Sequence, residues 1–240
     1  MKTERLIDHE LDALRDRLLR LGGETEAALQ LATVALVARD SAAAREVIAK
    51  DDEIDQQEVE LDRRCIDTLA LRQPVACDLR FVISVTRIAP LLGQIADHAC
   101  GIASAALELN EESRLSAHIK NIPRMAEIAA EMLRAALRAF VSSDAEAARA
   151  CIARGTEMDK LYRDASETLT RMMVSAPATT TRAVRLLMVA KYLERIGDYV
   201  TQIGEITIYL AEAAIVKRRS ARRMAIHPQL RGEQAIWLLN

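Results

Sequence analysis

Four polar side chains, three of them carboxylates, recur at about one-turn spacing near the end of the chain. They are Glu194, Asp198, Gln202 and Glu205. At about 100° per residue, all four share one face of a helix. Carboxylates one turn apart can bridge cations in a helical bundle, and their oxygens suit hard cations such as Mg, Mn or Fe. We therefore expect a metal site at Glu194 and Asp198.

An ordinary amphipathic helix is the alternative explanation of this face. Lys191 can pair with Glu194, and Arg195 with Asp198, each three residues further on. The opposite face is apolar, with Ile196, Val200 and Ile203. Under this alternative the acids are solvated surface charges.

Six long helices are expected to position these acids. Half of the 240 residues are apolar, only 3% are aromatic, and there are 8 Gly and 5 Pro. Such a mixture favours helix over sheet. Periodicity and capping signals predict helices over about residues 3–38, 41–72, 77–110, 114–141 (or from Pro123), 144–174 and 182–214. Pro90 should kink the third helix. The short connections make neighbouring helices antiparallel.

The chain also repeats itself at a spacing of 104 residues. Residues 40–55 match residues 144–159, so that Asp55 corresponds to Asp159, and with small slips Asp97 corresponds to Asp198. Solenoid repeats are at most roughly 50 residues long, and this unit is longer. We predict an all-α fold of two tandem three-helix bundles packed side by side, residues 1–110 and 111–216. The further acids that could complete the two sites are Glu58, Asp62, Glu157 and Asp164.

Charge is distributed unevenly along the chain. The net charge is −2, but residues 217–240 hold six basic residues against Glu233, a balance of +5 that leaves −7 for residues 1–216. This basic tail could meet anionic lipid or contact nucleic acid nonspecifically, or it could remain solvated. The overall balance and the single aromatic residue in the tail, Trp237, argue against specific nucleic-acid binding.

The remaining composition predicts a cytoplasmic protein. The four cysteines form no C-x-x-C pair and are expected to be reduced. No signal-peptide core follows the start, and no apolar run approaches the roughly 20 residues needed to span a bilayer.

Three segments resemble the PhoU family of phosphate-uptake regulators. They are residues 193–198 (LERIGD), 73–80 (QPVACDLR) and 52–55 (DEID), and the resemblance extends over roughly residues 5–214. It implies a pair of three-helix bundles, usually dimeric, with a Glu/Asp-x-x-x-Asp motif in each repeat that can bind metal clusters. It also implies negative regulation of phosphate import by an adaptor that links a phosphate ABC transporter to a membrane sensor kinase. No catalysis is implied.

The chain departs from this pattern in its first repeat. Glu194 and Asp198 keep the motif in the second repeat, whereas alignment through Asp97 places Gly93 at the position of the first acid, and Gly101 at that of Gln202. We expect the second repeat to bind metal better than the first, with Mg, Mn, Fe and Zn all open. His98 could replace a lost ligand in part, but a packed or surface histidine is the simpler interpretation.

The sequence thus predicts a homodimeric, cytoplasmic regulator of phosphate uptake that is not an enzyme. Its expected partners are the transporter ATPase and a membrane sensor histidine kinase, which would bring it close to the membrane. A carboxylate-bridged di-metal enzyme is one alternative, although none of the four histidines forms the Glu-x-x-His pair of redox bundles. A helical scaffold without metal is the other.

Overall fold

The computed structural model describes residues 6–112 and 121–216, and these residues are almost entirely helical with no strand. The first repeat contains α1 (Leu6–Ala38), α2 (Ser41–Ala49), α3 (Asp51–Arg72) and α4 (Ala76–Asn110). The second contains α5 (Asn121–Ser142), α6 (Ala145–Ser175), a short 3₁₀ turn (Pro177–Thr179) and α7 (Thr180–Glu212). The predicted all-α class is confirmed. The predicted tail, residues 217–240, lies outside the described residues.

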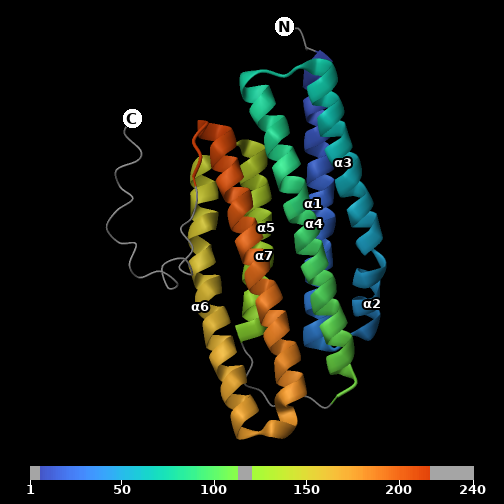
Figure 1. Ribbon diagram of the computed structural model, residues 1–240, viewed down its shortest axis with the longest axis vertical. Coiled ribbons are helices and arrows are strands. Elements are labelled where there is room, and N and C mark those ends of the chain that lie inside the picture. Colours follow the sequence, from blue (N-terminus) through green and yellow to red (C-terminus); the bar gives the residue numbers. More distant parts are fainter. Residues whose placement is uncertain (1–5, 113–120, 217–240) are drawn as a thin grey trace, which may run out of the picture.

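The two repeats lie side by side, with their long helices nearly parallel to one axis (Figure 1). Successive long helices of each repeat run in opposite directions. The repeats meet where α4 packs against α7 and α1 packs against α5. As a result, α4 and α7 form the central seam of the molecule and run antiparallel to one another. The predicted pair of three-helix bundles is therefore confirmed.

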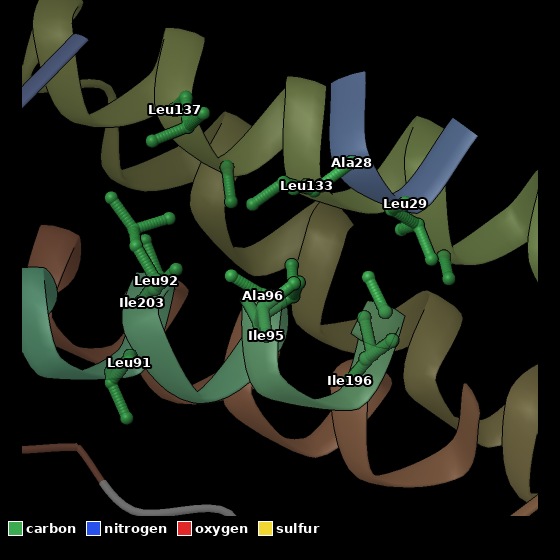
Figure 2. Close-up of a cluster of buried hydrophobic side chains, with 14 of the residues drawn as sticks. Ala28, Leu29, Leu91, Leu92, Ile95, Ala96, Leu133, Leu137, Ile196 and Ile203 are labelled. Atoms are coloured by element: carbon green, nitrogen blue, oxygen red, sulfur yellow. The ribbon is translucent and has the colours of Figure 1, made fainter. Parts of the chain in front are cut away.

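Both repeats contribute to one hydrophobic core. Figure 2 shows Leu92 and Ile95 of α4 beside Leu133 of α5 and Ile196 of α7, and all four side chains are fully or almost fully buried. Leu29 of α1 belongs to the same cluster. Burial of an aliphatic side chain of this size contributes about 1.5–3 kcal/mol. The shared core therefore fixes the orientation of the two bundles relative to one another.

The same capping arrangement ends the first helix of each repeat. Arg39 and Ser143, 104 residues apart, both adopt left-handed backbone angles with φ of 60° and 51°. The next residue in each case is an aspartate: Asp40 accepts hydrogen bonds from two backbone N–H groups of α2, and Asp144 accepts one from α6. These caps satisfy backbone donors at the start of a helix. The capping signals that predict helix starts near residues 41 and 144 are confirmed.

One predicted helix is divided in two. We expected a continuous helix over residues 41–72, but Lys50, with φ −92° and ψ −6°, ends α2 and precedes α3. The acids Asp51, Asp52 and Glu53 occupy the first turn of α3, where the helix dipole favours negative charge. This interaction with the helix dipole offsets part of the free energy lost where the backbone hydrogen bonds are interrupted at Lys50. At the equivalent place in the second repeat α6 is continuous.

Glycine and proline residues inside the predicted helices do not end them. α1 continues through Gly22 and Gly23, and α4 continues through the exposed Pro90. α5 begins at Asn121, so Pro123 lies in its first turn, where a missing N–H costs little.

The seam helix α4 is more apolar than we expected. By length and composition alone it could cross a membrane, because an 18-residue window reaches a mean hydropathy of 1.3. The expectation that no segment comes close to this limit is therefore wrong. In the fold, 56% of that window is buried, as in the central helix of a packed bundle.

A polar network holds the lower end of the seam in Figure 1. Arg39, directly after α1, donates hydrogen bonds to the carbonyl oxygens of Leu109 (2.6 Å) and Glu112. Arg185 of α7 pairs with the carboxylates of Glu108 and Glu112. Helix C-termini leave carbonyl groups without partners, and arginine satisfies them here. Residues of both repeats thus meet at the end of α4.

Candidate functional site

In the second repeat the predicted metal ligand Glu194 is buried. Glu194 is only 6% exposed, because α6 packs closely along α7. Lys191, three residues earlier, donates a hydrogen bond to its carboxylate, so the predicted ion pair is present. The idea that Glu194 is a solvated surface charge is wrong, however. Gln202, in contrast, is exposed.

Asp198 lies one turn further along α7 and is close to two other carboxylates. Burial raises the pKa of Asp198, and the negative charges of Glu194 and Asp159 raise it further. Lys191 and Arg195 act in the opposite direction without cancelling the effect. The structure therefore brings together the three acids predicted for the second repeat, Asp159 from α6 and the pair from α7.

The first repeat gathers acids on α3 and α4. Asp97 of α4 has a raised pKa because of burial and because of the nearby Asp51 and Asp55. Glu58 of α3 has a raised pKa through burial and through Asp55, Asp97 and Asp62. The predicted neighbours Asp55 and Asp97 are thus close together.

Two further members of this cluster, Asp51 and Cys100, were not among the predicted site residues. The Cys100 thiol donates a hydrogen bond to Oδ1 of Asp51 at 3.1 Å. Burial, that bond and the surrounding acids raise the pKa of Cys100 far above its usual range. Spacing could have found both residues, because Asp51 precedes Asp55 by one helical turn and Cys100 follows Asp97 by three residues.

Glu58 explains the missing acid at Gly93. A Cβ atom built on Gly93 would overlap the Glu58 carboxylate, so that carboxylate fills the space where a motif side chain would begin. In the second repeat the arrangement is reversed: Glu194 stands at the position of Gly93, and Tyr162, 104 residues after Glu58, replaces that acid. The ring of Tyr162 lies under the Lys191 ammonium group, 5.2 Å away. Each repeat therefore keeps one acid at this place, but on a different helix of the facing pair: Glu58 on α3 in the first repeat and Glu194 on α7 in the second.

His98 is packed in the seam between the repeats. Its ring stacks on Tyr192 and Tyr199 of α7, with centroids 5.2 and 5.5 Å away. Burial, with Arg195 and Lys191 nearby, lowers its pKa. Gly101, one turn on, allows this approach, because a Cβ there would lie 2.8 Å from the ring of Tyr192. The structure places His98 as a packing residue, the simpler of our two interpretations.

The clusters remain incomplete as metal cages. Within residues 6–112 and 121–216, no three His, Cys, Asp or Glu side chains converge closely enough to ligate one ion. The acids of each repeat lie near one another, but their donor atoms do not point at a common centre.

Two side-by-side three-helix bundles with acids at matching positions define a class of duplicated helical proteins. Comparison with known proteins identifies the family. The PhoU domain matches twice, at residues 18–106 and 122–207. The chain therefore belongs to the PhoU family.

The relatives match over nearly the whole chain. A "Phosphate-specific transport system accessory protein PhoU homolog" from Pseudomonas putida is 33% identical over 220 residues, which cover 92% of this chain and 86% of that protein. The homologue from Aquifex aeolicus is 35% identical, covering 88% and 95% respectively. The crystal structure of PhoU from Pseudomonas aeruginosa aligns with a TM-score of 0.84 and 33% identity, over 86% of this chain and 99% of that one.

The overlap at Gly93 predicts an unusual response to alanine. Glycine within a helix costs about 0.5–1 kcal/mol against alanine, and at Gly23, where a Cβ would meet no atom within 4 Å, Gly23→Ala should recover this amount. Gly93→Ala should give a smaller gain or a loss, because Glu58 must move. In a Glu58→Ala background the full gain should appear. Chemical denaturation of all four variants measures this, and equal gains at both glycines in the otherwise unchanged chain would contradict it.

The raised pKa of Asp198 predicts how stability depends on pH. A carboxyl whose pKa is higher in the folded than in the unfolded state stabilises the fold when protonated, so this contribution is lost as pH rises above 3.8 and through the folded pKa. Asp198→Asn should therefore be more stable than the unchanged chain at pH 7 and equal to it near pH 4. Denaturation across this range, with the exposed Asp164→Asn as the control, measures it. A difference that does not change with pH would exclude this explanation.

Proposed function

We propose that this protein is a negative regulator of phosphate uptake, acting as an adaptor between a phosphate ABC transporter and a membrane sensor histidine kinase. The observation that carries the proposal is the match of both repeats to the PhoU domain, together with relatives called accessory proteins of the phosphate-specific transport system. On this proposal the protein works in the cytoplasm as a homodimer, close to the membrane that holds both partners.

The mechanism we propose is binding rather than chemistry. The shared core makes the two bundles one rigid body, so a partner that contacts α3 and another that contacts α6 would be held at a fixed distance. A rigid body loses little conformational entropy on binding, which favours an adaptor. Asp97 and Asp198 carry charge at equivalent places on the two seam helices, where each partner could contact one repeat.

We further propose that the second repeat holds a hydrated divalent cation at Glu194, Asp198 and Asp159. Two features support this: the three carboxylates are close together, and the pKa of Asp198 is raised by burial and then by the negative charges of Glu194 and Asp159. Mg²⁺ usually keeps several water ligands and takes only one or two carboxylates from the protein, so it does not require a full cage of side chains. This donor set suits Mg²⁺ or Mn²⁺ better than Zn²⁺, which prefers Cys and His.

The cation would act locally. It would offset the repulsion between Asp198 and its neighbours and hold α6 against α7. The Lys191 ammonium, paired with Glu194, provides part of the same compensation from the protein itself. Lys191 and the cation therefore compete for that carboxylate, which keeps binding reversible.

Loss of a negative regulator should increase phosphate uptake. In the source organism, cells that lack the chain should accumulate ³²P-phosphate faster than unchanged cells in phosphate-rich medium, and the intact chain supplied in trans should restore the lower rate. Uptake of sulfate serves as the control for general transport effects. Unchanged phosphate uptake in the deletion strain would refute the proposed regulation.

The cation site can be tested on the purified protein. After equilibration with Mn²⁺ and removal of free ion, elemental mass spectrometry should find metal bound to the unchanged chain and much less in Glu194→Gln/Asp198→Asn. The matched variant of the first repeat, Glu58→Gln/Asp97→Asn, should keep most of the metal. Equal metal in all three proteins, or none in the unchanged chain, would remove the cation from the proposal and leave the adaptor role standing.

A further inference from the structure

One face of α3 is strongly acidic and partly apolar. Between residues 51 and 62 the helix carries seven acidic residues and no basic one. Four of these acids form a single row at one-turn spacing: Asp51, Asp55, Glu58 and Asp62. Beside this row, Val59 is 69% exposed and Ile66 is 56% exposed. We call this surface, the acidic row with Val59 and Ile66, the α3 face.

The acids of the α3 face repel one another. The charged neighbours that raise the pKa values of Glu58 and Asp97 are all acidic. In the second repeat, by contrast, Lys191 and Arg195 partly offset the repulsion at Asp198. Self-repulsion of this kind lowers stability, so a basic ligand that met the α3 face would be favoured.

The second repeat shows that the fold does not require such a surface. At the offset of 104, Arg163 and Thr170 of α6 replace Val59 and Ile66. Residues 155–166, which correspond to 51–62, carry three acidic residues against two basic ones. The same scaffold therefore exists with a nearly neutral, polar outer helix. The fold therefore does not require the concentrated negative charge of α3, and a surface of one charge sign attracts a partner of the opposite sign.

We propose that the α3 face binds the basic segment 217–223 of a second copy of this chain. That segment, KRRSARR, has five basic residues in seven, and four of them are arginines, whose guanidinium groups pair with carboxylates through two parallel hydrogen bonds. Arg218 and Arg222 are four residues apart, as are Asp51 and Asp55. The −7 of residues 1–216 and the +5 of residues 217–240 are thereby brought together between copies.

Chain geometry favours a second copy over the same copy. The basic run begins five residues after α7 ends, and its last residue, Arg223, lies eleven residues after Glu212, a length that spans at most about 40 Å when fully extended. α4 lies between α7 and α3, which adds two helix spacings of roughly 8–10 Å each. α3 and α7 both end at the top of the molecule in Figure 1. The acidic residues lie about 15–32 Å along α3 from that end. To reach Asp51 at the far end of the acidic row, a segment of the same chain would have to be almost fully extended around α4, whereas the segment of a second copy has no such limit.

Isotope-resolved cross-linking tests the proposal on the full chain and does not depend on the proposed role in phosphate uptake. Unlabelled and ¹⁵N-labelled chains are mixed in equal amounts at low salt and treated with a carbodiimide, which joins an amine directly to a carboxylate. Lys217 should link to peptides of residues 51–62, and the linked pairs should include those with one light and one heavy partner. The links should disappear in 0.5 M NaCl, where exposed charges are screened.

Matched variants identify the surface. Asp51→Asn/Asp55→Asn/Asp62→Asn should reduce these links about tenfold, as expected from losing three exposed or half-buried ion pairs. The control on α6, Glu157→Gln/Asp164→Asn/Glu167→Gln, should leave them nearly unchanged. Circular dichroism checks that both variants fold.

Three outcomes would overturn the proposal. Links only between peptides of one isotope would show that each chain binds its own segment. Links equally reduced by the α6 control would show that attraction is nonspecific. An absence of links, with the full chain sedimenting on phosphatidylserine vesicles, would assign the basic segment to an anionic membrane instead.

Discussion

The packing of α4 against α7 is the contact on which the rest of the molecule depends. Both helices are buried on the sides that face each other and both contribute to a core that also includes α1 and α5. Since aliphatic interiors are packed as densely as organic crystals, the two bundles cannot slide without opening voids. The acids on α4 and α7, and those of α3 and α6 beside them, therefore sit at fixed positions on a rigid body. Gly101 contributes directly, because it lets the ring of Tyr192 approach α4.

The two repeats handle buried acid in different ways. In the second, Glu194 is deeply buried and an ammonium group from the previous turn compensates for it. In the first, Glu58 reaches across from α3 into the space above Gly93, and its charged neighbours are other acids. One acid is thus neutralised within its own helix, while the other remains in a region of negative potential. The repeats share a scaffold but offer different electrostatic surfaces.

Much of the fold followed from the sequence, because it depends on regular signals. The capping signals near residues 41 and 144, the helical periodicity and the 104-residue offset all gave correct helices or helix ends. The interruption at Lys50 was not predicted, since α6 continues through the same place and no glycine or proline marks it. The acid neighbours Asp55 and Asp97 were predicted because they recur in both halves.

What the sequence could not supply was contact between helices. The first repeat pairs Glu58 with Gly93, whereas the second pairs Tyr162 with Glu194. The sequence alone does not show this difference, because it depends on which residues face each other between α3 and α4 and between α6 and α7. Burial of Glu194 was likewise missed, since helical spacing gives the angle of a side chain but not the neighbour that covers it. Stacking of His98 between two tyrosines depends on the same kind of contact.

The shared core has a consequence for the history of the chain. A single repeat would leave the inner side of its α4 open to water, and the contact that covers it is made by an equivalent helix running the opposite way. An ancestor with one repeat would therefore have needed an identical copy related by a two-fold axis. In such a symmetric pair every change appears on both sides at once. The reversed placement of Glu58 and Glu194 requires that the two halves vary separately, which is possible only once each half has its own coding sequence.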